Sequence, residues 1–346
     1  MKPVVSVVIP TYRRPEMLEC CLRAIIEQDF DAPYEIIVAD DEPSDVTLEL
    51  ITRLRAEQAA APPVPLAAIA GMGAAIAAAA AEPVPALRYI AMRDAHGPAA
   101  ARNAGWRAAR GRIVAFTDDD CRPMPGWLRA GVAALHDGIA GVDGRVIVPV
   151  PSPPTDAQRT LTGLERSRFV TANCLYRKAA LLEAGGFDER FAAPWREDSD
   201  LYFTLIERGR RLERAPAAIV VHPVRPPERF VSLREQKKSM YNALLYKKHR
   251  PLYRSRLQSR PPLRYYAALG ALLVASASLA KGRRRASVAG LAAWAGITLE
   301  FAAERLRGTS RRPSHVADML VTSALIPPLS IWWRLRGAWK YRVLFL

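Results

Sequence analysis

Three consecutive aspartates, Asp118, Asp119 and Asp120, follow the short apolar run 112–117. Such a run predicts a buried strand, and carboxylates at the carboxyl end of a strand lie where open α/β sheets bind ligands. Carboxylates packed this closely repel one another, and burial raises that cost. A divalent cation shared with a phosphate would relieve the repulsion, because Mg²⁺ and Mn²⁺ prefer oxygen ligands. A solvated acidic turn is the alternative if the three residues are taken alone.

The segments on either side of the aspartates alternate between strand and helix patterns. Strands are predicted at 4–9, 35–39, 87–90, 112–117, 144–149 and 218–222, and helices at 15–28, 46–58, 98–110, 127–135, 178–184 and 196–208. This alternation is typical of an α/β sheet with right-handed crossovers. The pattern therefore predicts an α/β sheet flanked by helices.

One uncharged stretch, residues 62–81, nominally reaches the length of a transmembrane helix. It is mostly alanine interrupted by prolines and glycines, and it separates two predicted strands of one sheet. A bilayer-spanning segment at this place would pull the sheet apart. An Ala/Pro-rich surface insertion over about residues 56–86 is the better interpretation.

The net charge of +16 is distributed unevenly along the 346 residues. From Arg229 onward there are 23 Lys or Arg against 4 Asp or Glu, whereas residues 1–228 carry 27 basic and 30 acidic residues. A basic tail on a near-neutral domain predicts a polyanionic partner surface, either nucleic acid or an anionic membrane.

The residues between these charges favour a membrane. Residues 229–264 form a basic amphipathic linker, and apolar runs follow at 265–280, 286–299 and 319–333. A nucleic-acid-binding arm should be polar throughout, whereas apolar runs with tryptophans suit a lipid surface. We therefore expect residues 265–346 to form an apolar, helical, membrane-associated region that binds no nucleic acid. A soluble helical cap or an oligomer interface is the alternative.

The first apolar runs look short for a membrane span. Sixteen helical residues cover about 24 Å, whereas the hydrocarbon core is about 30 Å thick. A crossing at 265–280 would also place the basic segment 281–285 on the far side, against the positive-inside rule. The expectation is interfacial or re-entrant helices at the cytoplasmic side of a cell inner membrane.

The four cysteines, Cys20, Cys21, Cys121 and Cys174, show no metal-ligand spacing and fit a reducing cytosol. The amino terminus enters the first predicted strand without the apolar core of a signal peptide.

Five features occur in order along the chain, and together they carry a resemblance. They are Pro10-Thr11-Tyr12-Arg13, Asp40-Asp41, Arg102-Asn103, the aspartate triplet and Glu197-Asp198. This ordered set resembles the family 2 glycosyltransferases, inverting enzymes of the GT-A fold, over about residues 4–225. The resemblance implies an α/β catalytic domain with a GT-A-type mixed sheet over residues 1–228, followed by the basic α-helical region.

The resemblance also implies roles for the motif residues. Asp40 would accept hydrogen bonds from the nucleobase or ribose, Asp118 would face the ribose, and Asp120 would coordinate the metal that bridges the diphosphate. Asp119 is the variable middle position and would point elsewhere. The expected nucleotide-sugar-binding residues are Pro10, Thr11, Tyr12, Arg13, Asp40, Arg102, Asn103, Asp118 and Asp119.

On the acceptor side, the resemblance makes Asp198 the general base, with Asp200 as the alternative. Thr171, Asn173 and Glu197, with Gly185-Gly186, would shape the sugar pocket. His222 at a strand end is either a further metal ligand or a structural histidine.

These residues predict a hexosyltransferase that moves one sugar from a nucleotide-sugar donor, with UDP as the expected nucleotide, to a lipid-linked or glycan acceptor. Transfer would be assisted by Mn²⁺ or Mg²⁺ and would invert the anomeric carbon. The Gln-x-x-Arg-Trp signature of processive synthases is absent, which favours single-sugar transfer. Pro43 departs from the family's usual Asp-Asp-Gly-Ser turn. A sugar-phosphate nucleotidyltransferase and a non-enzymatic nucleic-acid-binding protein are the alternatives.

Overall fold

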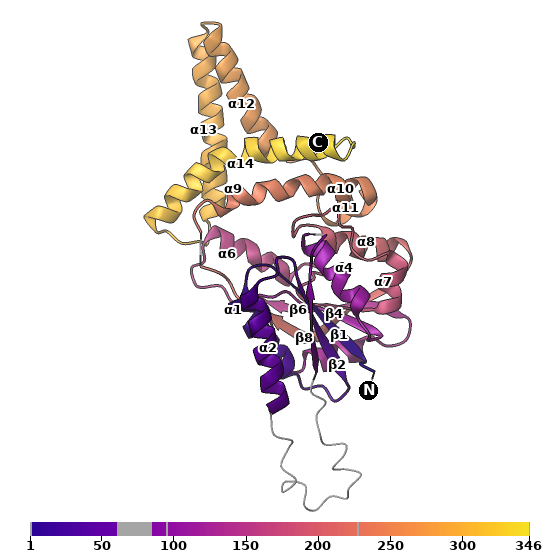
Figure 1. Ribbon diagram of the computed structural model, residues 1–346. Helices are drawn as coiled ribbons and strands as arrows, with labels where there is room; N and C mark the ends of the chain where they lie inside the picture. Colours follow the sequence, from indigo (N-terminus) through magenta and orange to yellow (C-terminus); the bar gives the residue numbers. More distant parts are fainter. Residues whose placement is uncertain (1, 61–84, 95, 227, 346) are drawn as a thin grey trace, which may run out of the picture. The chain divides into compact units, whose positions relative to one another are not determined.

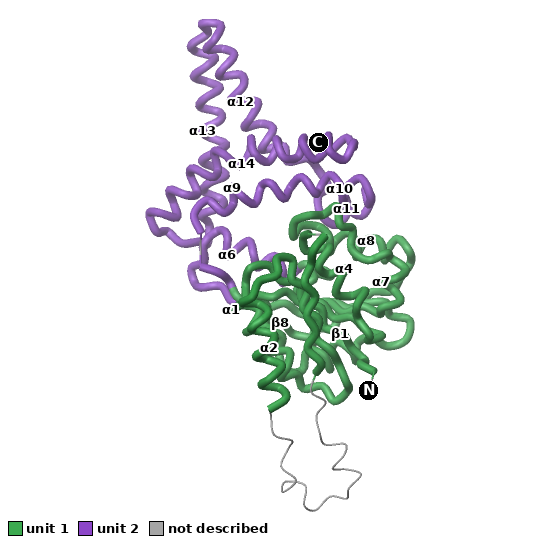
Figure 2. The backbone as a smooth tube through the Cα atoms, in the orientation of Figure 1, with its two compact units in different colours: residues 1–148, 167–223 green, residues 149–166, 224–346 purple. Residues whose placement is uncertain are grey.

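The computed structural model describes residues 2–60, 85–94, 96–226 and 228–345. They form two compact units (Figure 2): unit 1 comprises residues 1–148 and 167–223, and unit 2 comprises 149–166 and 224–346. The predicted catalytic domain 1–228 therefore differs from unit 1 mainly by the segment 149–166. Residues 61–84, which make up most of the predicted insertion, lie outside the described residues.

Unit 1 is built on one eight-stranded sheet (Figure 1) in the order β3-β2-β1-β4-β7-β6-β8-β5. Its strands are β1 Val5–Thr11, β2 Tyr34–Asp40, β3 Ala86–Ala91, β4 Ile113–Phe116, β5 Arg122–Pro123, β6 Ile139–Ile147, β7 Cys174–Arg177 and β8 Arg211–Val221. The neighbouring interior strands β1 and β2 are almost wholly buried, as continuous β-branched runs in a covered parallel sheet should be.

The sheet is mixed, yet most of its strands share one direction. β1 is parallel to β2 and β4, and β2 is parallel to β3. β7 is antiparallel to both β4 and β6, so β6 again runs in the direction of β4. β8 is parallel to β6 and therefore also ends at the same edge of the sheet as β4.

The helices of unit 1 follow the predicted pattern closely. They are α1 Pro15–Ile26, α2 Asp45–Ala60, α4 Pro98–Ala108, α5 Trp127–Ala134, α7 Lys178–Ala184 and α8 Glu197–Glu207. α1 buries Leu18, Cys21, Leu22 and Ile25, at the helical spacing of its sequence. Proline at the first helical position begins both α1 and α4, where its missing N–H costs nothing.

Unit 2 is helical in its described residues (Figure 1). Its helices are α6 Asp156–Leu161, η2 Thr162–Glu165, α9 Val231–Glu235, η3 Gln236–Met240, α10 Tyr241–Lys248, α11 Arg250–Arg256, α12 Leu263–Ala280, α13 Arg284–Leu306 and α14 Pro313–Lys340. α6 begins with a capping box between Thr155 and Gln158. Figure 2 shows α6 in the same unit as the three long helices, although they are far apart in sequence.

The three long helices exceed the apolar runs from which we predicted them. α12, α13 and α14 span 18, 23 and 28 residues, and each has the length and composition to cross a membrane. At 1.5 Å per residue, α12 alone covers about 27 Å, close to the thickness of a hydrocarbon core. The expectation that the first two runs are too short for a span is therefore wrong on length, because each helix extends beyond its apolar run and includes charged residues near its ends, such as Arg264 and Arg305. Interfacial or re-entrant placement stays a prediction.

α12 and α13 pack tightly as an antiparallel hairpin. At Gly290, an added Cβ would lie 2.9 Å from the backbone nitrogen of Ala275 and 3.0 Å from the carbonyl oxygen of Ala271. Small residues at this crossing allow the close backbone approach found between helices in membranes. The outer side of the hairpin exposes large apolar side chains, including Leu273, Leu279 and Val288.

A buried charged network holds α6 to the long helices within unit 2. Arg305 of α13 donates to Asp156 Oδ2 through Nε at 3.0 Å and through a terminal nitrogen at 2.8 Å. It also donates to the hydroxyl of Thr322 at 2.7 Å. Both charged residues are buried, so each compensates the desolvation of the other.

Candidate active site

The candidate site lies at the edge of the sheet where the parallel strands end. The register pairs Thr11 of β1 with Asp40 of β2 and Val8 of β1 with Phe116 of β4, so the aspartates after β4 follow the same edge. α4 begins at this edge as well, because Gly97 just before it donates its backbone N–H to Asp41 at 2.9 Å. Carboxyl ends of parallel strands and amino termini of the following helices are the usual place for ligands in such sheets.

Arg102 joins the two acidic motifs, although it lies 95 residues before Glu197 and 16 before Asp118. Its guanidinium donates to Asp118 Oδ1 at 2.8 Å and to Glu197 Oε1 at 2.9 Å. Arg102 and Glu197 are both buried, whereas the side chain of Asp118 is partly exposed. Burial acts to lower the pKa of Arg102, but the two carboxylates outweigh it and raise that pKa. Arg102 is thus paired with two carboxylates in this structure, and its role in nucleotide-sugar binding stays a prediction.

Glu197 and Asp198 begin helix α8 directly after Arg196, which has a left-handed backbone. Burial raises the pKa of Glu197 to about 7, against the opposing effect of Arg102. Burial also raises the pKa of Asp198, while the backbone N–H of Ser199 acts in the opposite direction. A buried carboxylate with a raised pKa is a stronger base than an exposed one.

Asp119 lies against the end of β1 instead of pointing away from the site. Its Oδ2 accepts the hydroxyl proton of Thr11 at 2.8 Å, and its Oδ1 lies 3.3 Å from a guanidinium nitrogen of Arg14. Burial and the neighbouring Asp120 raise the pKa of Asp119 to about 6, although Arg14 and Thr11 counteract them. The middle aspartate therefore links the triplet to β1 and α1.

Asp120 faces His222 from the adjoining strand end. His222 Nε2 lies 3.6 Å from Asp120 Oδ1, and the side chains are 13% and 11% exposed, respectively. Together with Cys121, these residues form a group whose ligand atoms all lie within 4.8 Å of one another. Oxygen and imidazole ligands fit Mn²⁺ and related divalent ions, so the residues present fit the expected metal. The structure thus brings the two predicted metal ligands together.

Asp40 and Asp41 at the end of β2 differ in their surroundings. Asp40 is fully buried and accepts hydrogen bonds from the hydroxyl of Tyr89 at 2.9 Å and from the backbone N–H of Glu42 at 3.1 Å. Burial raises the pKa of Asp40 against these hydrogen bonds. Asp41 is partly exposed, and its carboxylate lies 3.1 Å from His96 Nδ1. Asp41 is therefore the more accessible acidic group, although the sequence analysis emphasised Asp40.

Asn103 and Asn173 serve the fold. Asn103 donates to the carbonyl oxygen of Phe187 at 2.8 Å and accepts the indole N–H of Trp106 at 2.8 Å. Asn173 accepts the indole N–H of Trp127 at 2.9 Å and donates to the carbonyl oxygens of Arg145 and Ala218. Both amides are completely buried. Their hydrogen bonds hold loops to helices and strands, and the ligand contacts expected from the sequence stay predictions.

The remaining predicted residues lie at the end of β1, directly after it, or just before β7. Pro10 and Thr11 end β1, and Tyr12 is exposed directly after it. Arg13 has a left-handed backbone and pairs with Glu42 after β2. Thr171 is buried in the turn that leads into β7.

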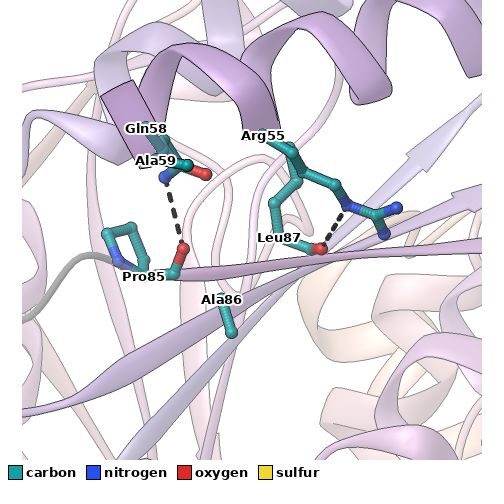
Figure 3. A pocket seen from close by; sticks show the side chains of 6 residues that line it. All are labelled: Arg55, Gln58, Ala59, Pro85, Ala86 and Leu87. Carbon is teal, nitrogen blue, oxygen red and sulfur yellow. Dashed lines mark hydrogen bonds between the residues drawn. The ribbon is translucent and has the colours of Figure 1, made fainter. Parts of the chain in front are cut away.

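A separate pocket lies at the opposite ends of the strands (Figure 3). It is lined by Arg55, Gln58, Ala59, Pro85, Ala86 and Leu87, from the end of α2 and the beginning of β3. Arg55 and Gln58 donate to the carbonyl oxygens of Leu87 and Pro85, at 2.9 and 3.2 Å. Since β3 begins here and ends beside Asp40, this pocket is distinct from the candidate active site.

The comparisons with known proteins agree with this geometry. The fold is of the GT-A type, because the chain superposes on the mannosyltransferase PcManGT from Pyrobaculum calidifontis, solved with GDP-Man and Mn²⁺. That superposition has a TM-score of 0.57 at 18% identity and covers 96% of this chain and 88% of the other. The family model "Glycosyl transferase family 2" matches residues 6–63 and 73–187. The chain is a member of glycosyltransferase family 2.

Curated relatives are also glycosyltransferases. Glycosyltransferase AglE of Haloferax volcanii is 27% identical over 65% of this chain and 68% of its own length. The GalNAc(5)-diNAcBac-PP-undecaprenol beta-1,3-glucosyltransferase of Campylobacter jejuni is 27% identical over 42% of this chain. The match spans 39% of the Campylobacter protein, well under half of its length.

Proposed function

We propose that this glycosyltransferase transfers a single sugar, with inversion, from a nucleotide-sugar donor to a lipid-linked or glycan acceptor at the cytoplasmic face of a membrane. The observation that carries the proposal is the pair of hydrogen bonds from Arg102 to Asp118 and Glu197. Through Arg102 the aspartate triplet and Glu197 share one site, which supports a donor-binding role for the first and a base role for the neighbouring Asp198.

On the donor side, Asp118 is the most exposed member of the triplet and would offer a carboxylate to the ribose. Asp41, more accessible than Asp40, is the acidic group that we assign to the nucleobase or ribose, a change from the assignment made on sequence. Asp120 and His222 would hold a divalent ion, Mn²⁺ in preference to Mg²⁺ because imidazole suits Mn²⁺ better. Such an ion supplies charge neutralisation for the departing nucleoside diphosphate.

On the acceptor side, Asp198 would take the proton from the attacking hydroxyl. Its raised pKa makes proton transfer more favourable, while the backbone N–H and the hydroxyl of Ser199 both donate to its carboxylate and orient it. Glu197 Oε2 is buried without a hydrogen-bond partner among the described residues. A hydroxyl of the bound sugar or acceptor would satisfy this atom, which supports a role for Glu197 in the sugar pocket.

The membrane part of the proposal rests on unit 2. Three helices of spanning length and composition follow a basic linker, which supports association with a membrane and hence an acceptor held in that membrane. Family membership favours sugar transfer over nucleotidyl transfer and over nucleic-acid binding. UDP remains the nucleotide that we propose to test first.

The test is a calorimetric panel of nucleotide sugars on the full chain in detergent, with and without Mn²⁺. Asp120→Asn should weaken Mn²⁺-dependent donor binding by about tenfold or more, since a charged ligand is lost. Asp198→Asn should keep donor binding and lose transfer by about 100-fold or more, as expected for a general base. Donor binding that ignores both Mn²⁺ and the Asp120 substitution would contradict the proposed metal role.

A further inference from the structure

The metal-ligating group beside the active site contains a cysteine that the proposed function does not use. Asp120, Cys121 and His222 present an oxygen, a sulfur and a nitrogen within 4.8 Å of one another. Other cysteines of the described chain, Cys21 and Cys174, are buried outside this group, and Cys20 is exposed on α1.

The sheet register explains why these residues meet. β5 and β8 are antiparallel, with Arg122 opposite Val221 and Pro123 opposite Val220. The backbone N–H of Met124 continues the same ladder by donating to Ile219 at 2.9 Å. Extended by one residue beyond the ends of β5 and β8, the same register brings Cys121 to His222, in agreement with the closeness of their ligand atoms. Residues directly opposite in an antiparallel pair have their Cβ atoms about 4.5–5.5 Å apart and their side chains on the same face.

A tight turn adds the third member. The backbone N–H of Cys121 donates to the carbonyl oxygen of Asp118 at 3.0 Å, which closes the turn containing Asp120. The three side chains are therefore held by backbone hydrogen bonds on both sides. A site positioned in this way needs little rearrangement to receive an ion.

The group is also sheltered from water. Cys121 is only 1% exposed, and the side chains of Asp120 and His222 are 11% and 13% exposed. Ligands in a sheltered site lose less to competition from water, while the two partly exposed residues leave a way for an ion to enter.

We propose that Asp120, Cys121 and His222 form a site for thiophilic divalent ions, Zn²⁺ above all, with an open fourth position. Mg²⁺ takes oxygen ligands, whereas a thiolate and an imidazole are typical ligands of Zn²⁺ and Cd²⁺. Binding replaces the S–H bond of Cys121 by a metal–sulfur bond and releases the proton to solvent. This inference rests on the proposed function, which assigns Asp120 and His222 to the metal of the donor. Bound Zn²⁺ would therefore exclude Mn²⁺ from these ligands and inhibit sugar transfer.

The direct test is titration of the full chain in detergent with Cd²⁺ in the absence of nucleotide, followed by ultraviolet absorption of the thiolate–cadmium bond. We expect one equivalent of Cd²⁺ to produce this band in the wild type. Loss of even an outer-shell partner costs about 10–100-fold in metal affinity, so Cys121→Ser should weaken Cd²⁺ binding by at least about tenfold and abolish the band. Cys20→Ser, at an exposed cysteine, is the matched control and should keep both the Cd²⁺ affinity and the absorption band.

Mn²⁺ binding, measured by electron paramagnetic resonance, separates this proposal from the proposed function. Cys121→Ser should leave Mn²⁺ affinity within about twofold, because a hard ion gains little from the thiol. Cd²⁺ bound by the wild type without an absorption band would overturn the thiol site, whether or not the serine variant folds. Mn²⁺-dependent donor binding could persist in that case, and the proposed glycosyltransferase chemistry would be untouched.

Discussion

At the scale of single residues, the buried guanidinium of Arg102 is the group on which the candidate site most depends. It neutralises Asp118 and Glu197, one on each side, and its loss would leave Glu197 as a buried charge without its partner. Removing one member of a buried pair typically costs about 3–5 kcal/mol.

We therefore expect Arg102→Ala to lower the free energy of unfolding by about 3–5 kcal/mol. Arg107→Ala on the same helix is the control: its side chain is 55% exposed, and surface substitutions usually change stability by less than about 0.5 kcal/mol. Chemical unfolding of the full chain in detergent measures both. Equal stabilities of the two variants would show that the buried pairs contribute nothing.

Asp119 gives a second prediction, for pH dependence. Its pKa rises from about 3.9 in an unfolded chain to about 6 when folded. The folded state therefore binds this proton more tightly, and the contribution of Asp119 to stability is complete below pH 4 and is lost as the pH rises through 6. A shift of about two units corresponds to at most about 3 kcal/mol.

Asp119→Asn should accordingly be more stable than the wild type at pH 7.5, with a smaller difference at pH 4.5, when metal is removed by a chelator. Asp31→Asn, at a side chain that is 90% exposed, should show no such pH-dependent difference. Thermal unfolding at the two pH values decides. A variant that is destabilised equally at both would mean that the hydrogen bonds from Thr11 and Arg14 outweigh burial.

The types of the site residues were predictable from sequence, but their partners were not. Asp118, Asp120 and Asp198 were expected at the site from the order of the motifs, and the structure brings the first two together with His222 and Arg102. Asn103 and Asn173 stand in the same motifs, yet their partners are tryptophans and carbonyl groups from distant segments. A sequence shows a polar side chain, whereas only the fold shows which polar group is near it.

At the scale of secondary structure, the predicted strands and helices were largely correct wherever an apolar pattern was continuous. β5 has two residues and α6 has six, so neither has enough residues to show a period. β5 was missed for that reason, and with it the β5–β8 pairing that brings Cys121 near His222. The cysteines show no metal-ligand spacing along the chain. Spacing in the sequence does not reveal ligands that two paired strands bring together, such as Cys121 and His222.

The α12–α13 hairpin carries a prediction at this scale. Gly290→Leu should force the helices apart, because its Cβ would already contact the backbone of Ala275. Overpacking of this kind costs about 1–3 kcal/mol. Gly296→Leu on the same helix is the matched control, since nothing lies within 4 Å of its added Cβ.

Thermal unfolding in detergent measures this difference, and the Gly296 variant should melt close to the wild type. If both variants melt together with the wild type, the two helices do not depend on close packing at Gly290.

At the scale of the whole molecule, the important fact is that unit 2 is not a simple tail. It includes residues 149–166, which leave unit 1 after β6 and return before β7. The linear sequence placed this segment inside the catalytic domain because nothing in its composition marks its partner. That partner, Arg305, lies 149 residues later.

A chain ending at residue 228 should therefore keep its sheet and lose protection of 149–166. We expect trypsin to cleave it at Arg159 at least about tenfold faster than the full chain. The contact between Asp156 and Arg305 is missing from the shorter chain, so local opening of this segment costs less free energy. Cleavage at the exposed Arg107 is the internal control and should be unchanged. Equal cleavage rates at Arg159 would indicate that the segment folds on its own.

The pairing of Asp156 with Arg305 also has a consequence for biosynthesis. A ribosome adds about 5–20 residues per second, so Asp156 emerges roughly 7–30 s before its partner. The sheet can be completed within that interval, since its last strand ends at Val221. Synthesis thus imposes an order in which the sheet forms first, and Asp156 of α6 gains the buried guanidinium of Arg305 only afterwards.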